Sequence, residues 1–304
     1  MDKYIPIAYH SSYKLSLPKE HRFPMEKYEL LPKKLLDKGI SKKTDFFLPY
    51  YPKTESIVEV HDKEYVLKLK NLKLSRSEIR RIGFPLSKEL IDREFLIAGG
   101  TILGATKALT QRISMNIAGG THHSFSNKGE GFCLLNDQAI AAKYLLKKNN
   151  INKILILDLD VHQGNGTASI FKSNKQVFTF SMHGAKNYPF KKEKSDLDIG
   201  LKDNTSDFEY LTILKKTLPS LIKKVKPDFI FYLSGVDVIK TDKLGRLSLS
   251  IEGCKERDRF VFSICEKENI PVQCSMGGGY SEDIDIIVDA HLNTYKMAKK
   301  IYLK

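Results

Sequence analysis

The segment 154–167, ILILDLDVHQGNGT, constrains the fold more than any other part of the chain. The four aliphatic residues that begin it predict a strand covered on both faces, as in a parallel sheet. Side chains alternate along a strand, so Asp158, Asp160 and His162 point the same way as it ends. Two carboxylates buried side by side are costly unless a cation or strong donors compensate them. The segment therefore predicts a buried strand that ends beside a positive charge.

The rest of the chain repeats this order of strand followed by helix. Strand-like runs occupy residues 5–9, 113–120, 153–160, 176–183, 228–235 and 270–279. Amphipathic stretches such as 136–149 and 206–225 lie between them and predict helices. The alternation predicts an α/β fold whose parallel sheet carries helices on both faces. No repeat or Gly/Ser linker divides the chain, so we expect one domain over residues 1–304, and the absence of GxGxxG after the first strand excludes a Rossmann fold.

Composition limits the setting in which the chain works. No apolar run approaches bilayer length and the N-terminus lacks a signal-peptide pattern, so we expect no membrane span and a cytoplasmic location. The four cysteines form no CxxC pair, which indicates neither disulfides nor a thiolate zinc site. The net charge is +14, but the lysines are mixed with acidic and apolar residues along helix-like segments. Nucleic-acid binding is therefore not expected.

Polar residues follow the strand-like runs, in GGTHHSF, DLDVHQGNG, SMHG, SGVDV and GGGYS. Ligands of parallel sheets bind at the carboxyl ends of the strands, so these five segments are expected to form one site. Asp160 and His162, on the same face of one strand, can reach a single ion, and Asp237 can supply a third ligand. Such a set leaves coordination positions for water and substrate, which is typical of a catalytic zinc site.

Other side chains of these segments fit acid–base chemistry. His122 and His123 can hold one water from two sides, with Asp158 accepting a hydrogen bond from one histidine and Asn165 holding the other. Tyr280 follows three glycines and can donate to an oxygen that becomes negative in the transition state. The structural alternatives are a hydrogen-bonded histidine pair and a tyrosine that covers a glycine-rich turn.

The motifs together carry a family resemblance. GGTHHSFSNKGEGFCLLND, DLDVHQGNGT, SGVDVIKTDKLGRLSLS and GGGY, in this order, resemble the histone deacetylase superfamily, with its arginase-like α/β fold. The resemblance runs from about Tyr9 through Tyr280, and HQGNG with DKLGRLSLS is most similar to class IV enzymes and their bacterial relatives. It implies a zinc-dependent deacylase, with ferrous iron as the other candidate metal, whose ligands are Asp160, His162 and Asp237.

The resemblance also implies a role for each remaining residue. His122 and His123 match the tandem histidines, with Asp158 paired to the first, and Tyr280 matches the transition-state tyrosine. Asn165 stands where class I has an aspartate, as in classes II and IV. This amide is expected to keep His123 less basic and more available as a protonated acid or shuttle.

A substrate tunnel and a second cation are implied as well. Gly131 and Phe132 match one wall of an acyl-lysine tunnel, Tyr188 matches a second aromatic wall, and Gly278 is expected to border it. A structural potassium ion is implied at Asp158, Asp160, His162, Ser181 and Met182.

Three functions stay open on this reading. The first is removal of an acyl group, acetyl or longer, from the ε-amine of lysine in proteins or peptides. The second is hydrolysis of acylated polyamines or other small amides, and the third is a non-catalytic module that binds acyl-lysine. Outside the motifs, we expect His183 to be structural, residues 195–201 with Asp196 and Asp198 to form a solvated or capping loop, and residues 21–28 to form an entrance loop.

Overall fold

Eight parallel strands form one sheet in the computed structural model, which describes residues 3–148 and 151–303. The strand order is β2-β1-β3-β8-β7-β4-β5-β6, and every neighbouring pair runs parallel. The strands are β1 (Ile7–Ala8), β2 (Phe46–Phe47), β3 (Ile113–Asn116), β4 (Ile154–Asp158), β5 (Val177–Gly184), β6 (Leu197–Leu201), β7 (Phe229–Leu233) and β8 (Val272–Ser275). The predicted parallel α/β sheet is confirmed. The domain expected over 1–304 also includes residues 1, 2, 149, 150 and 304, which lie outside the described residues.

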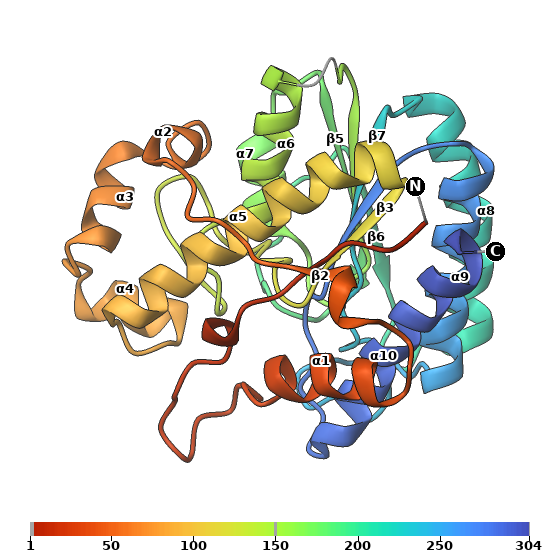
Figure 1. Ribbon diagram of the computed structural model, residues 1–304, viewed down its shortest axis with the longest axis horizontal. Coiled ribbons are helices and arrows are strands. Elements are labelled where there is room, and N and C mark those ends of the chain that lie inside the picture. Colours follow the sequence, from red (N-terminus) through yellow and green to blue (C-terminus); the bar gives the residue numbers. More distant parts are fainter. Residues whose placement is uncertain (1–2, 149–150, 304) are drawn as a thin grey trace.

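Helices cover both faces of this sheet (Figure 1). α5, α6 and α7 lie on one side of the strands, whereas α8, α9 and α10 lie on the other, and α2, α3 and α4 gather near one end of α5. The helices are α1 (Lys27–Asp37), α2 (Thr54–Ile57), α3 (Lys63–Lys70), α4 (Arg76–Ile82), α5 (Lys88–Gln111), α6 (Asp137–Lys148), α7 (Asn165–Phe171), α8 (Asp207–Val225), α9 (Ile251–Lys267) and α10 (Ile284–Tyr302), with short 3-10 turns at Ser11–Tyr13 and Lys43–Asp45. None of those in the described parts of the chain has the length and apolarity needed to cross a bilayer.

β4 is a central strand, as its aliphatic run predicts. All five of its residues are buried, and β5 and β7 pair with it on either side. Leu157 lies opposite Phe180 of β5 and Tyr232 of β7, so aromatic side chains flank the aliphatic row. Continuous burial on both faces explains why this strand shows no polar alternation.

α8 shows how local sequence sets a helix boundary. The Ser206 hydroxyl accepts a hydrogen bond from the Glu209 backbone N–H, and the Glu209 carboxylate accepts one from the Ser206 backbone N–H. This capping box satisfies two N–H groups that the first turn leaves without helical partners. Tyr210, Leu214 and Leu218, spaced four residues apart, are buried against the core. The helix thus begins where the sequence predicted.

Two strands were not predicted, and one prediction is wrong. Leu197–Leu201, expected to be a solvated or capping loop, is β6 and pairs with β5 at the edge of the sheet. Four of its five residues are only partly buried or exposed. Such a strand needs no continuous apolar run, so its sequence resembles that of a loop. Asp198 nevertheless caps a loop, because its carboxylate accepts hydrogen bonds from the Gln163 side chain and the Ser195 N–H, both at 2.8 Å. β2 was not predicted because two residues are too few to show a strand pattern in the sequence.

Candidate active site

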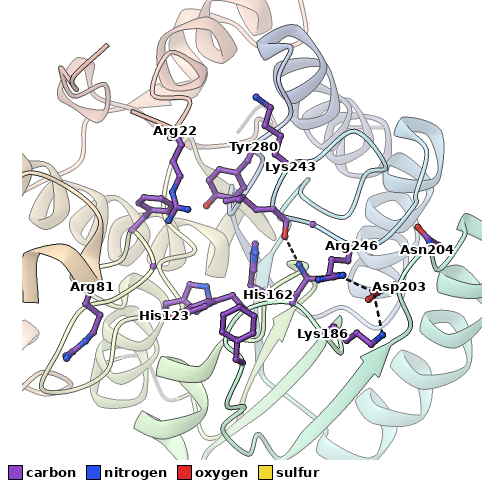
Figure 2. Close-up of a pocket in the computed structure, with 17 residues that line it drawn as sticks. Arg22, Arg81, His123, His162, Lys186, Asp203, Asn204, Lys243, Arg246 and Tyr280 are labelled. Carbon is purple, nitrogen blue, oxygen red and sulfur yellow. Dashed lines mark hydrogen bonds and ion pairs between the residues drawn. The ribbon is translucent and has the colours of Figure 1, made fainter. Parts of the chain in front are cut away.

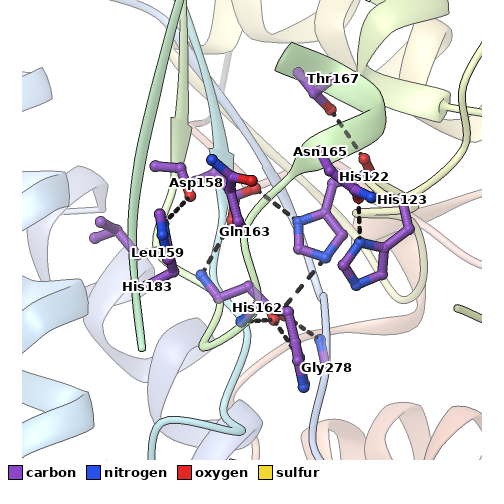
Figure 3. Close-up of polar contacts among 12 residues, drawn as sticks. His122, His123, Asp158, Leu159, His162, Gln163, Asn165, Thr167, His183 and Gly278 are labelled. Atoms are coloured by element: carbon purple, nitrogen blue, oxygen red, sulfur yellow. Dashed lines mark hydrogen bonds and ion pairs between the residues drawn. The ribbon is translucent and has the colours of Figure 1, made fainter. Parts of the chain in front are cut away.

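Neighbouring strands end beside one another and bring the predicted residues together. β3, β8, β7 and β4 are consecutive in the sheet. The loop after β3 carries the paired histidines, the loop after β4 carries Asp160 and His162, the loop after β7 carries Asp237, and the loop after β8 carries Tyr280. Parallel strands place these loops at one edge, and Figure 3 shows the β3 and β4 residues in contact there.

Asp160, His162 and Asp237 form a buried cluster that could hold a metal ion. One potential ligand atom from each residue lies within 4.8 Å of those of the other two. His162 Nδ1 lies 3.1 Å from Asp160 Oδ1 and 3.1 Å from Asp237 Oδ2. Burial alone would lower the pKa of His162, but these carboxylates outweigh it and raise the pKa to about 10. The cluster therefore attracts positive charge strongly, and its two carboxylates and one imidazole match the oxygen and nitrogen donors that zinc accepts.

The backbone holds the two carboxylates of this cluster in place. The Val161 N–H donates to Asp237 Oδ1 at 3.0 Å, and the Gly278 N–H donates to Asp160 Oδ2 at 2.9 Å. A Cβ atom at Gly278 would lie 2.0 Å from Asp237 Oδ2, so only glycine fits there. Gly278 lines a small inner cavity of about 40 Å³ that Gly131, Phe132 and Tyr280 also line, and its place at the border of the tunnel stays a prediction. Glycine is suited to this position because its N–H holds Asp160 and its lack of a side chain leaves room for Asp237.

Each histidine of the tandem pair has its own hydrogen-bond partner (Figure 3). His122 Nδ1 lies 2.6 Å from Asp158 Oδ2, and His123 Nδ1 lies 2.7 Å from Asn165 Oδ1. The two ring centroids are 4.1 Å apart, and both residues are buried. With Nδ1 bound, the Nε2 atom of each ring is left as the group that can exchange a proton.

The two partners give the histidines opposite pKa shifts. Burial disfavours the charged form of both, but the Asp158 carboxylate outweighs it and raises the pKa of His122. Burial, with the positive charges of His122 and His162, holds the pKa of His123 well below its ordinary value. The direction agrees with the less basic His123 that was expected, because a neutral amide cannot offset burial, and the role of this histidine as acid or shuttle stays a prediction. The lowered pKa favours the neutral imidazole, whose Nε2 can accept a proton.

Glu130 supports this arrangement and was missed by the sequence reasoning. Its Oε1 atom accepts hydrogen bonds from Asn165 Nδ2 at 2.7 Å and from the Tyr188 hydroxyl at 2.9 Å. A carboxylate accepts only, so Asn165 must turn its NH2 toward Glu130 and its carbonyl oxygen toward His123. That orientation requires a hydrogen on His123 Nδ1 and leaves the Nε2 lone pair free. An acidic residue beside the glycines of GEGFC was the available signal.

Tyr280 lies beside the candidate metal ligands, and aromatic rings pack around it. Its ring centroid is 5.8 Å from that of Phe23, 6.1 Å from that of Phe132 and 6.3 Å from that of His162. Its backbone N–H donates to Asp242 Oδ2 at 2.6 Å. Burial holds the pKa of the phenol well above its ordinary value, so the O–H stays a hydrogen-bond donor.

Lys27 is a second residue that the sequence reasoning missed. It is fully buried, with its Nζ 5.4 Å from the Tyr280 ring centroid and 5.0 Å from that of Phe23. Burial lowers its pKa to about 8, although the charges of Asp237 and Asp242 act in the opposite direction. Nothing in its local sequence marks it, because it simply begins α1.

A cavity of about 750 Å³ connects the site to the surface (Figure 2). His123, His162 and Tyr280 lie at its inner end, and the predicted tunnel residues Gly131, Phe132 and Tyr188 also line it. The His123 and Tyr188 ring centroids are 5.0 Å apart. At Gly131, where φ is +56°, a Cβ atom would lie 2.7 Å from His123 Cδ2. Glycine lets the wall approach the histidine closely.

The remaining predicted residues lie next to this site. In the β4–β5 register Asp158 lies opposite Ser181, and Met182 follows, so three of the five residues assigned to potassium are neighbours. Ser181 Oγ and His183 Nδ1 are 2.9 Å apart, and burial lowers the pKa of His183 to about 4, in keeping with a structural histidine. In the expected entrance loop at 21–28, Arg22 lines the large cavity.

Comparisons with known proteins find relatives along nearly the whole chain. A family model described as the histone deacetylase domain matches residues 21–294. An uncharacterized protein of Picosynechococcus sp. is 42% identical over 98% of this chain and 99% of its own length. Histone deacetylase 2 of Arabidopsis thaliana is 29% identical over 91% of this chain and 74% of its own, and the acetoin utilization protein AcuC of Staphylococcus aureus is 27% identical over 86% and 73%. The crystal structure of the HDA15 HD domain has the same fold, with a TM-score of 0.83 at 18% identity over 99% of this chain and 90% of its own.

Proposed function

This chain belongs to the histone deacetylase family, and on that premise we propose that it is a zinc-dependent hydrolase of acylated lysine. One relative is named a histone deacetylase, and membership of the same family supports amide hydrolysis by this chain. The observation that carries the proposal is the buried Asp160, His162 and Asp237 cluster at the inner end of a cavity, beside two histidines and a tyrosine. These are the groups that metal-assisted amide hydrolysis requires.

The donor set of the cluster fits a divalent metal. When bound, zinc or ferrous iron would polarise the acyl carbonyl and make a water more acidic. His123, neutral and with Nε2 free, accepts a proton from the attacking water and passes it to the leaving amine. His122, whose proton Asp158 retains, keeps positive charge beside the developing oxyanion.

Tyr280 has a separate role in this mechanism. Its high pKa keeps the phenol protonated, so the O–H can donate to the acyl oxygen as that oxygen becomes negative. The tight packing around its ring fixes the donor before substrate arrives. Fixed dipoles stabilise a transition state at no reorganisation cost, which makes this donor a large contributor to rate.

The cavity favours the stem of an acyl-lysine as substrate. Phe132 and Tyr188 offer aromatic walls to an unbranched aliphatic chain, and Phe190 is exposed at the entrance. Acetyl and longer acyl groups are both candidates. Asn165 supports a class II or class IV assignment over class I, and class IV is proposed from HQGNG together with DKLGRLSLS. The adjacency of Asp158 and Ser181 supports the potassium assignment. A pure binding module is disfavoured, because every catalytic role has a residue in place.

The proposal is tested by metal content and turnover together. The purified protein is analysed for metal and assayed on acetyl-lysine peptide, long-chain acyl-lysine peptide and acetylated polyamine, each with and without chelator. We expect about one divalent metal per chain and chelator-sensitive release of one acyl group from a lysine peptide. Full turnover in the presence of chelator, or metal-loaded protein that leaves every lysine peptide intact, would contradict the proposal. Preference for the polyamine would favour the second function.

A further inference from the structure

The entrance of the large cavity is rich in basic side chains, which no step of the proposed reaction uses. Five cations and one carboxylate line it: Arg22, Arg81, Lys186, Lys243, Arg246 and Asp203. We call the five basic residues the rim cations. Figure 2 shows Arg22 and Arg81 on one side of His123 and His162 and shows Lys186 and Arg246 on the opposite side, with Lys243 next to Tyr280 in this view. Positive charge therefore surrounds the route to the site.

Asp203 compensates this charge only in part. Its Oδ2 atom lies 3.1 Å from Arg246 Nε and 3.9 Å from Lys186 Nζ, so one carboxylate serves two cations. Both cationic side chains are more than half exposed. Two charges that share one partner leave an excess of positive charge on this side of the entrance.

The other rim cations are compensated even less. Lys243 Nζ lies 3.4 Å from Glu282, whose side chain is 88% exposed, and an ion pair in such a position contributes little. Within the described ranges, no carboxylate lies within 4.0 Å of the Arg22 or Arg81 guanidinium. These two arginines therefore have their donors available for a ligand.

The protein fold fixes the three arginines beside the tunnel. The Gly131 N–H of the tunnel wall donates to the Arg81 carbonyl at 3.1 Å, and the Asn204 N–H donates to the Arg246 carbonyl at 2.7 Å. The Arg22 guanidinium lies over the Phe132 ring, 5.1 Å from its centroid. Arginines from three distant segments thus have defined places at one opening.

We propose that the rim cations select an acylated lysine flanked by carboxylates, such as an acidic segment of a protein or peptide. This inference rests on the proposed deacylase function and names its substrate class. Guanidinium groups bind carboxylates with paired hydrogen bonds, and a positive entrance raises the rate at which anionic partners arrive. A lysine-rich segment or an acylated polyamine brings further positive charge and is repelled.

The test uses one acetyl-lysine in three peptides, flanked by aspartate and glutamate, by neutral residues, or by lysine and arginine, with acetylated spermidine beside them. An exposed ion pair changes affinity by roughly 1.4- to 5-fold, so several pairs give about a tenfold higher kcat/KM for the acidic than for the basic peptide. The difference is expected in KM and should shrink at high salt, because salt screens exposed charges.

A rim variant and a matched control show whether the rim cations cause the preference for the acidic peptide. The variant combines Arg22→Gln, Arg81→Gln and Arg246→Gln, and should bring the acidic-to-basic ratio of kcat/KM close to one. The control removes the same charge far from the entrance.

That control combines Lys223→Gln, Lys267→Gln and Lys300→Gln. All three lysines are exposed near the ends of α8, α9 and α10, which lie at the opposite edge of the sheet from the site. We expect the control to keep the ratio of the unaltered protein. Thermal melting of both variants shows that they are folded.

The inference is overturned by equal kcat/KM for acidic and basic peptides, by a preference for acetylated spermidine, or by a ratio that the rim variant retains. Turnover of the neutral peptide tests the proposed function separately. If no peptide is hydrolysed, fluorescence anisotropy with labelled acidic and basic acetyl-lysine peptides still decides. Tighter binding of the acidic peptide that is lost in the rim variant supports selection by the rim cations. Equal binding of the two peptides refutes it.

Discussion

Replacement of Tyr280 by phenylalanine removes one oxygen from the site and nothing else. The ring keeps its packing on Phe23, Phe132 and His162, and no side chain in the described part of the chain hydrogen-bonds the phenol oxygen. The free energy of unfolding should therefore change by less than about 1 kcal/mol. In catalysis the lost donor is that of an oxyanion hole, whose removal costs about 2.7–4 kcal/mol, or about 10²–10³ in kcat.

The assay measures kcat and KM on an acetyl-lysine peptide, with metal content and thermal melting on the same preparations. We expect kcat to fall by the stated factor while KM, metal content and melting temperature stay close to those of the unaltered protein. A kcat within threefold of the original, about 0.7 kcal/mol, would refute the role given to the phenol. A large drop in melting temperature would instead show that the hydroxyl has a structural partner.

Other perturbations test the metal cluster, the support of the histidines, the buried histidine of the core, and the central strand. Asp237→Asn should copurify with little divalent metal by elemental analysis, since one carboxylate of the buried cluster is lost; full metal occupancy would overturn the ligand assignment. Glu130→Ala should lower kcat about tenfold by freeing the Asn165 amide to turn, and Glu130→Gln should restore part of it because its oxygen still accepts; an unchanged kcat in Glu130→Ala would contradict this. His61 is buried with a pKa lowered to about 4 by burial, so the unfolded state binds the proton first as pH falls below about 6.5. The contribution of His61 to the free energy of unfolding, about 3 kcal/mol, is present above that pH and is lost between about pH 6.5 and 4. In urea titrations the free energy of unfolding of His61→Gln should therefore depend less steeply on pH than that of the unaltered protein. An equal slope would contradict the role given to His61. Leu157→Ala should destabilise the fold by about 2–5 kcal/mol in the same titrations, since the side chain is fully buried between two strands; a loss under about 1 kcal/mol would contradict this packing.

The sequence by itself determined the class of fold and the identity of the residues at the carboxyl edge. The aliphatic run of β4 is buried on both faces, as its sequence predicts. The strand ends at Asp158, so Asp160 and His162 lie in the loop that follows it and not on the strand itself, although their place at its carboxyl end follows from the sequence. These are properties of consecutive residues, so they can be read without knowing the partners. The convergence of the strand ends followed from the rule that parallel strands share one carboxyl edge.

Only the tertiary structure decided how these residues are supported and what surrounds them. Glu130 and Asn165 are 35 positions apart, and their hydrogen bond sets the state of His123 through an amide that could turn either way. Lys27 is buried beside Tyr280 although its own helix gives no reason for it. The arginines of the entrance come from three separate segments. Such features depend on the relative placement of distant backbones, and local periodicity carries no information about that placement.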